Sequence, residues 1–546
     1  MNSPDTDSLN LLDYSVIAGY FFILIVLVLY ITLVDRKKAK ELGAVASYFL
    51  GGKNLGWIVI GASLFASNIG TEHLVGLAGA GAAGDFAAGQ FELFAAFALL
   101  LLGWLFVPFY LKSGVYTMPE FLEKRYSSWS RGYLSYISIA GYILTKISVT
   151  IAAGGIIFTT LLGVDFWTGS IIIVVITGLY TVFGGLKAVI YTDFMQLIVL
   201  LIGSIVLTFF GLSELGGMEA LQAATTPEHF SLWRPMSDPN FPWTGILFGA
   251  PILGVWYWCT DQFIVQRVLA AKNMNNARQG TIFAGFLKTL PLFIFVLPGV
   301  IAFALASQNP EKFNFPIIDG VQNFDAALPM ITMSLLPAGL KGLVVAGLIA
   351  ALMSSLSSVF NSCSTLITID IYKKFDPKAS EKKLVVVGQL STVVLVVLGL
   401  AWIPLLKLIE GGLFQKLQSI QAYISPPIAA LFLIGVFSKK VNEKGAKAAL
   451  LTGLVLGVLR LLLELNKSSL SGGLFYFADI NFLHFAIILF LICAAVLWVF
   501  STPVAQPKNI ENLIYSKQVM QFAGQRTNAI LSAFLVITIL MLWIIF

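Results

Sequence analysis

The chain carries little charge for its length. Only 11% of its 546 residues are charged, whereas 58% are hydrophobic and the mean hydropathy is +0.87. A soluble protein carries about 25% charged residues, so this shortage excludes a large water-soluble domain. Polar and apolar residues do not alternate along the hydrophobic runs, which argues against an outer-membrane barrel. The predicted fold class is therefore an all-α polytopic membrane protein.

Cysteine and histidine are also scarce. Cys259, Cys363 and Cys493 lie in separate apolar segments without CxxC spacing, which argues against a disulfide framework or a zinc site and indicates buried small hydrophobic residues. Of the three histidines, only His73 lies in a polar cluster at membrane depth, and its sequence neighbours include no nucleophile or metal partner. We therefore do not expect an enzyme.

Long hydrophobic runs make up most of the chain and predict fourteen transmembrane helices, because about 20 apolar residues cross roughly 30 Å of hydrocarbon. The windows are 14–34, 55–80, 86–111, 132–161, 166–184, 188–214, 243–266, 280–306, 328–372, 384–408, 414–437, 446–465, 480–501 and 526–546. The ninth window is long enough to continue as a helix beyond the membrane surface.

The basic residues fall mainly in alternate loops. Clusters of Lys and Arg follow the first, third, seventh, ninth and eleventh windows and precede the last, whereas the loops 215–242 and 307–327 carry few. The positive-inside rule then places both termini outside the cell. This orientation explains the net charge of +6, so we expect a lipid bilayer and no nucleic acid as a partner.

Polar residues cluster in the second window. The segment GASLFASNIGTEHLVGLAGAG contains Asn68, Thr71, Glu72 and His73 among five glycines. Such a pattern is typical of a helix that breaks near its middle and leaves backbone groups available to a solute. Alternatively, the glycines serve only close packing and the polar groups bond within the protein.

Two further windows contain charged residues at similar depth. Glu92 and Lys288 could each hydrogen-bond a neutral polyol or could neutralise one another. The segment WYWCTDQ at 256–262 offers aromatic rings that could stack on a sugar ring or belong to an interfacial belt. Asp261 and Arg267 are expected to form a structural pair near the inner surface.

The ninth window is rich in hydroxyl groups, with serines at 354, 355, 357, 358 and 362. Asp193, near the start of the sixth window, is the nearest unexplained carboxylate. Hard oxygen atoms of this kind suit a hard cation such as sodium. The ordinary alternative is that each serine bonds the carbonyl four residues earlier in its own helix.

Several motifs carry a resemblance to a known family. They read NIGTEHLVGLAG, YTMPEFLEKR, GGLKAVIYTDFMQ, WYWCTDQFIVQRVLAAKN, LMSSLSSVFNSCSTLITIDIYKK and QSIQAYISPPIAALFLIGVFSKK. From about residue 14 to the C-terminus the chain resembles the sodium/glucose cotransporters of the solute:sodium symporter family. It lacks the long cysteine-bearing external insertions of the animal members, so we expect a bacterial source and the inner membrane as its location.

The resemblance implies the LeuT-like inverted repeat of 5+5 helices, with a substrate site near the midplane. Residues 1–54 would form a peripheral helix and a cytoplasmic loop, 55–214 the first repeat, 215–242 an external loop, 243–438 the second repeat, and 439–546 three peripheral helices. We have no function for residues 502–527.

The resemblance also implies a sugar site with gates on both sides. Its hydrogen-bonding residues would be Asn68, His73, Glu92, Lys288 and Gln418, with Tyr257 beneath the sugar ring as the inner gate and Trp256 and Trp258 beside it. The outer lid would be Leu77, Phe91 and Phe414. Two departures alter the contacts: Gly254 replaces a polar side chain, and Gln421 replaces a small hydroxyl residue.

Two sodium sites are implied by the same resemblance. The first would use the carbonyl groups of Ala66, Ile69 and Ala351 with the hydroxyl groups of Ser354 and Ser355. The second would use Ser67, Ser357, Ser358 and Asp193. The expected function is sodium-coupled import of glucose or galactose by alternating access, with two Na⁺ per sugar. The alternatives are symport of inositol, a monocarboxylate or an amino acid, and a sodium/sugar sensor without coupled flux. The oligomeric state cannot be read from the sequence.

Overall fold

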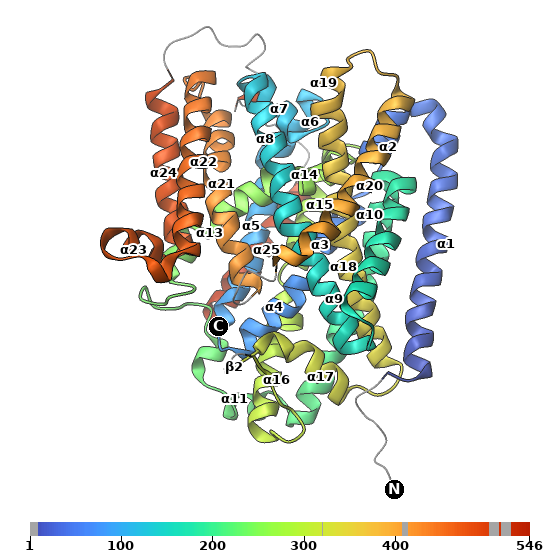
Figure 1. Cartoon of the computed structure of the whole chain (residues 1–546), viewed down its shortest axis with the longest axis vertical. Coiled ribbons are helices and arrows are strands. Elements are labelled where there is room, and N and C mark those ends of the chain that lie inside the picture. Colours follow the sequence, from blue (N-terminus) through green and yellow to red (C-terminus); the bar gives the residue numbers. More distant parts are fainter. Residues whose placement is uncertain (1–8, 319, 407–412, 502–512, 515–525) are drawn as a thin grey trace.

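The protein is built almost entirely of helices that run roughly along its long axis (Figure 1). The structure is a computed structural model and describes residues 9–318, 320–406, 413–501, 513–514 and 526–546. Within these ranges, eleven helices are long and apolar enough to cross a membrane, or up to twelve if one bent pair counts as a span. The protein is therefore a mostly helical polytopic membrane protein, as predicted, and the total of fourteen spans stays a prediction.

The elements before residue 243 form the first part of this bundle. They are α1 (Leu11–Leu42), α2 (Ala44–Leu50), α3 (Trp57–Asn68), α4 (Thr71–Ala82), α5 (Gln90–Leu101), α6 (Val107–Ser113), α7 (Met118–Arg125), α8 (Ser128–Gly141), α9 (Ser148–Leu162), α10 (Phe166–Leu215) and α11 (Met218–Ala223). Wider, π-helical turns join α5 to α6 and α8 to α9, so that each of these pairs runs on as one span.

The elements from residue 243 onward form the second part. They are α12 (Trp243–Phe248), α13 (Ala250–Gly254), α14 (Gln262–Leu269), α15 (Met274–Leu287), α16 (Leu297–Gln308), α17 (Ala327–Leu335), α18 (Leu340–Thr365), α19 (Lys373–Phe375), α20 (Glu381–Leu406), α21 (Leu413–Phe437), α22 (Glu443–Leu465), α23 (Gly472–Asp479), α24 (Phe482–Val499) and α25 (Arg526–Ile545). A small antiparallel hairpin, β1 (Ile317–Ile318) with β2 (Val321–Gln322), lies in the loop before α17.

The helix α10 is too long for a single crossing, because 50 residues extend about 75 Å. Gly185 interrupts it with φ +58° and ψ −165°, a backbone conformation that suits glycine. A Cβ atom at this position would also meet the carbonyl oxygen of Tyr48. The two windows predicted at 166–184 and 188–214 thus correspond to the two arms of α10.

The windows expected to lead the two repeats are both interrupted. In the first, α3 and the following helix are bent by 61° at a short break. In the second, the segment 243–269 consists of α12, α13, a π-helical turn η6 (Val255–Thr260) and α14. Asp261 separates the last two with extended backbone and caps α14 through a bond from the Phe263 amide. The interruption predicted within the window 55–80 is therefore confirmed.

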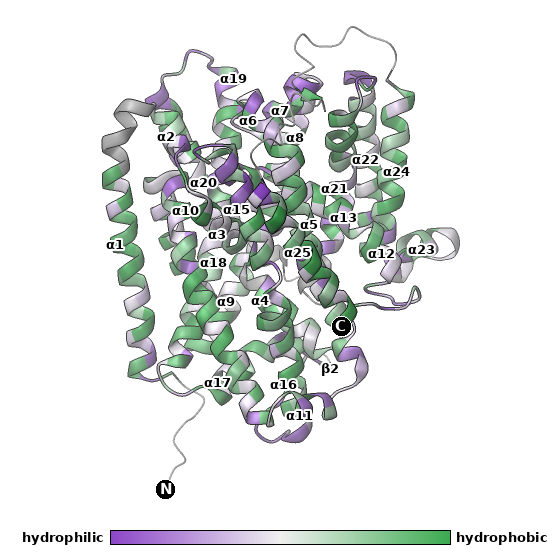
Figure 2. Ribbon diagram, turned by 180° about the vertical axis from the view of Figure 1, so that it is seen from behind, coloured by the Kyte–Doolittle hydropathy of each residue, from purple (hydrophilic) through white to green (hydrophobic). Residues whose placement is uncertain are grey.

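The surface and the interior differ as a membrane requires. Figure 2 shows hydrophobic residues along the lengths of the helices and hydrophilic residues gathered at the two ends. Helix α18 lies in the interior, where its apolar window is 94% buried, whereas the window of α25 is 17% buried. The cysteines Cys259, Cys363 and Cys493 are buried and free, as predicted.

The described ends of the chain both lie in the lower half of the molecule in Figure 1. Asp13, near the start of α1, accepts hydrogen bonds from the amides of Gly339 and Gly342 at the start of α18. The carbonyl group of Phe546 accepts one from the amide of Leu232 in the loop 215–242. This arrangement agrees with termini on one side of the membrane, and the assignment of that side to the exterior stays a prediction.

Candidate functional site

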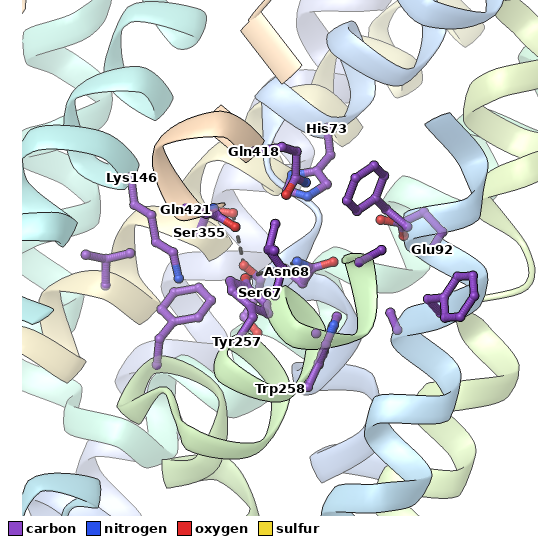
Figure 3. A pocket seen from close by; sticks show the side chains of 18 of the residues that line it. Ser67, Asn68, His73, Glu92, Lys146, Tyr257, Trp258, Ser355, Gln418 and Gln421 are labelled. Carbon is purple, nitrogen blue, oxygen red and sulfur yellow. Dashed lines mark hydrogen bonds between the residues drawn. The ribbon is translucent and has the colours of Figure 1, made fainter. Parts of the chain in front are cut away.

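A cavity lies where α4, α5, η6 and α21 meet beside the break between α3 and α4 (Figure 3). The space between its walls, the part open to solvent included, is about 720 Å³. Six of the predicted substrate residues line it: Asn68, His73, Glu92, Tyr257, Trp258 and Gln418. The structure thus gathers residues from four distant segments of the sequence into one site.

The break between α3 and α4 places Asn68 and His73 on the cavity wall. Asn68 is the last residue of α3, and its side-chain amide donates to the Tyr257 hydroxyl oxygen at 3.0 Å. His73 follows on α4, and Figure 3 shows its ring next to Gln418 at the upper end of the cavity. The side chains of Thr71 and Glu72 lie outside the described residues.

Glu92 and Lys288 form a buried ion pair, with Lys288 Nζ 2.5 Å from Glu92 Oε2. The same ammonium group donates to the side-chain oxygen of Asn68. Glu92 lines the cavity, whereas Lys288 is fully buried at the end of α15, behind both partners. Lys288 therefore neutralises Glu92 and bonds Asn68, two residues of the cavity wall, and its predicted direct contact with a sugar stays untested.

The aromatic residues of η6 form one side of the cavity. The rings of Tyr257 and Trp258 meet edge to face with their centroids 5.1 Å apart. Both rings line the cavity, whereas Trp256 does not. A π-helical turn shifts the side chains that follow it relative to a regular helix, and such turns are common at functional sites. The two departures from the family pattern, Gly254 and Gln421, also line the cavity.

The predicted outer lid is only partly described. Phe91 lines the cavity, and its ring meets Phe241 of the loop 215–242 with centroids 6.0 Å apart. Leu77 is fully buried on α4 and does not line the cavity. Phe414 lies on α21, but its side chain is outside the described residues.

The first predicted sodium site gains support from the backbone at the break. The Gly70 amide donates to the Asn68 carbonyl, and the His73 amide donates to the Gly70 carbonyl. In a continuous helix these two amides would instead serve the carbonyl groups of Ala66 and Ile69. Both carbonyl groups have thus lost their regular partners at the position where sodium ligands are expected.

Helix α18 brings the other predicted ligands of this site to the break. The hydroxyl group of Ser355 donates to the Ser67 carbonyl at 3.1 Å, and its oxygen keeps lone pairs for a cation. Ser354 directly precedes Ser355 and Ala351 lies one turn earlier on the same helix, and both are buried. The hydroxyl group of Ser354 donates to Asp193 at 2.6 Å, so this residue also reaches the second predicted site.

The second predicted sodium site contains a basic residue that the sequence interpretation did not place there. Arg267 Nη2 is 3.4 Å from Asp193 Oδ2, and the same nitrogen donates to the Ser358 hydroxyl. Ser357 and Ser67 bond carbonyl groups of their own helices. Of the predicted ligands, Asp193 and Ser358 therefore share a cationic partner in the structure.

The expected pair of Asp261 with Arg267 is not formed. Asp261 instead lies 3.2 Å from Lys146 Nζ, while Arg267 pairs with Asp193. Helical neighbours that face one another are three or four residues apart, so a spacing of six across an extended residue directs the two groups to different partners.

Sequence reasoning missed Lys146 and Ser63. Lys146 lines the cavity beside Tyr257, and its ammonium group lies 4.3 Å from the centroid of that ring. Ser63 donates to Asp193 at 2.5 Å and accepts from Arg267 at 2.8 Å. Lys146 is a charged residue inside an apolar window, so the rule applied to Glu92 would have found it. Ser63 carries no comparable signal.

The architecture and site define a class of protein. The structure is similar to a Na⁺-coupled sialic acid symporter in a substrate-bound outward-open state, with a TM-score of 0.74 and 22% identity over 91% of this chain and 99% of the other. It is also similar to MHP1, a nucleobase-cation-symport-1 family transporter, with a TM-score of 0.50 and 14% identity over 84% of this chain and 95% of the other. The chain thus shares the fold of these two transporters.

The sequence matches are more specific. The model of the Sodium:solute symporter family matches residues 48–453. Sodium/glucose cotransporter 1 of Ovis aries is 41% identical, covering 91% of this chain and 80% of its own. Sodium/glucose cotransporter 4 of Mus musculus is 43% identical over 84% and 71%, and the sodium/myo-inositol cotransporter of Homo sapiens is 40% identical over 83% and 67%. This chain belongs to the sodium:solute symporter family, whose coupling ion is sodium.

Proposed function

We propose that the protein imports a neutral hexose, glucose or galactose, together with sodium by alternating access. One observation carries the proposal: a single helix break provides binding groups for both the sugar and the sodium ion. Asn68 faces the cavity with its side chain, while the carbonyl groups of Ala66 and Ile69 are released from their regular partners beside Ser355. Sodium and sugar therefore favour the same arrangement of this segment, which is what reciprocal coupling requires.

The charge of the cavity supports a neutral substrate. Lys288 neutralises Glu92, and Lys146 neutralises Asp261, so the charged groups around the cavity are paired. A carboxylate substrate would need an uncompensated cation in this buried site. The rings of Tyr257 and Trp258 can stack on the apolar face of a sugar. A hexose fits this wall better than a monocarboxylate or an amino acid.

Inositol is the second candidate. It is also a neutral polyol, and a sodium/myo-inositol cotransporter is among the relatives. Gly254 and Gln421 line the cavity where the family carries other side chains, so they would decide between ring hydroxyl patterns.

In the proposed cycle, sodium from outside fixes the break between α3 and α4 against α18 and completes the sugar site. Sugar binding then lets the outer lid close, and opening below Tyr257 releases both ligands. Each charge that moves through 100 mV gains about 2.3 kcal/mol. We propose two Na⁺ per sugar, which would support roughly a two-thousand-fold sugar gradient at 100 mV, against about fifty-fold for one ion. The inner membrane of a bacterium remains our proposal for its location.

Uptake of labelled glucose and galactose into proteoliposomes tests the proposed function. We expect accumulation with an inward sodium gradient and none with potassium in its place. Gln418→Ala should lose most uptake because it removes an amide that lines the cavity. The proposal fails if folded protein binds sodium but accumulates neither sugar, and uptake of inositol, carboxylates or amino acids would then identify the alternative. Binding of sugar without concentration would indicate a sensor.

A further inference from the structure

A buried arginine stands where a second sodium ion is expected. Asp193 and Arg267 are both fully buried, and their charged groups are 3.4 Å apart. The guanidinium group also donates to the hydroxyl group of Ser358, another ligand expected for that ion. A cation of the protein itself therefore already contacts two of the expected ligands.

The hydroxyl group of Ser63 holds the two charged groups together. It donates to Asp193 Oδ2 at 2.5 Å and accepts from Arg267 Nε at 2.8 Å. The other carboxylate oxygen of Asp193 accepts from Ser354 at 2.6 Å. These bonds join α3, α10, α14 and α18 at one buried point.

Sodium and the guanidinium group compete for the same negative charge. A buried carboxylate balances one cation, and a second cation beside it would be left uncompensated in a site that excludes water. Arg267 belongs to α14, which begins directly after the extended residue Asp261, and Asp261 follows the turn that carries Tyr257. A movement of this segment would carry Arg267 with it.

We propose that Arg267 is a tethered competitor of sodium at Asp193. In the conformation of the structure the guanidinium group holds the second cation position, and sodium enters there only when α14 withdraws Arg267. The inference rests on the proposed function and deepens it, because it links the second ion to a movement of the segment that carries the inner gate. It differs from a permanent structural ion pair, which sodium would never replace.

Equilibrium binding of ²²Na⁺ to the purified full-length protein in detergent, without sugar, tests the competition. Arg267→Gln removes the competing charge, so the half-saturating sodium concentration should fall about tenfold, within the usual range of coupling between sites. The number of bound ions per chain at a fixed moderate sodium concentration should also rise. The gain should vanish in the double variant Arg267→Gln/Asp193→Asn, because the carboxylate that binds the ion is gone.

Two further variants control for folding. Ser63→Ala keeps both charges but removes the hydroxyl group that joins them, so it should raise sodium affinity in the same direction and by less. Arg278→Gln is the matched control, since Arg278 is equally buried but bonds the Gly103 carbonyl and not Asp193. It should leave sodium binding unchanged. Thermal unfolding would verify that each variant is folded. If Arg267→Gln does not fold, the sodium affinity of Ser63→Ala tests the competition instead.

The proposal is overturned if folded Arg267→Gln or Ser63→Ala binds sodium no better than the parent chain. It is also overturned if the parent already binds two ions with equal, high affinity. A parent chain that binds no sodium would contradict the proposed function itself, so the two failures are distinguishable.

Discussion

Two buried ion pairs of this protein consist of the same kinds of groups but have different surroundings. Lys288 with Glu92 and Arg267 with Asp193 each join a basic residue to a carboxylate in the interior. Glu92 belongs to the cavity wall, and Lys288 lies behind it. Asp193 instead lies among the hydroxyl groups of Ser63, Ser354 and Ser358, which either bond it directly or share its partner.

The difference shows what each pair does. Lys288 also bonds Asn68, so removing it would disturb two residues that face the cavity. We interpret this pair as a fixed part of the sugar site. The neighbours of Asp193 are oxygen atoms that suit sodium as well as a guanidinium group. We interpret the second pair as exchangeable.

The largest expected effect follows from removing Lys288. Lys288→Met should abolish uptake and destabilise the protein by about 3–5 kcal/mol, because Glu92 is left buried without a partner. Lys288→Met/Glu92→Gln should recover most of the stability but not the transport. Thermal unfolding and proteoliposome uptake measure the two effects. Normal uptake by the single variant would show that this pair is dispensable. The interpretation of Lys288 and Glu92 as a fixed part of the sugar site, unlike Arg267 and Asp193, would then be wrong.

A smaller loss is expected at the first sodium site. Ser355→Ala removes a hydroxyl group beside the helix break, so the half-saturating sodium concentration for uptake should rise about tenfold, the effect of one lost interaction of about 1.4 kcal/mol. Ser391→Ala is the matched control, because its hydroxyl group bonds a carbonyl group of its own helix α20. Equal sodium dependence of both variants would place the coupling ion elsewhere, leaving Asp193 as the main candidate.

Another ion pair, Lys146 with Asp261, should have a smaller effect on uptake when it is broken than Lys288 with Glu92. It joins the turn between α8 and α9 to the segment beneath Tyr257, so it should stabilise the closed inner side. Lys146→Gln and Asp261→Asn should each alter the sugar concentration for half-maximal uptake. In a double-mutant cycle their effects should couple by about 1 kcal/mol. Additive effects would show that the pair does not act as a unit.

The smallest effects are expected from the two departures from the family pattern. A Cβ atom at Gly254 would meet only the Ala98 Cβ, at an ordinary 3.5 Å. Gly254→Ser and Gln421→Thr should therefore fold and change the preference between glucose, galactose and inositol by about threefold to tenfold, as one hydrogen bond of about 1 kcal/mol allows. Competition of each unlabelled polyol against labelled sugar measures this. An unchanged order of preference would exclude both positions as determinants.

The helical fold and the interrupted second window could be predicted because they depend on local sequence. Apolar runs predict the spans, and the glycines around Asn68 and His73 predict the break. Polar residues at membrane depth also identified most of the cavity wall. The pairing of Arg267 with Asp193 could not be predicted, because it depends on how α14 packs against α10, residues far apart in the chain. For the same reason the sequence left open whether Glu92 and Lys288 bind a polyol or neutralise one another. The structure shows that they form an ion pair.

Equilibrium binding of sugar and sodium to the purified protein tests the central claim most directly, since the claim is that one helix break serves both ligands. The account predicts that sodium raises sugar affinity several-fold over potassium and that sugar raises sodium affinity by the same factor. Ser355→Ala should reduce both factors together. Sugar that binds equally tightly in sodium and in potassium would contradict the account.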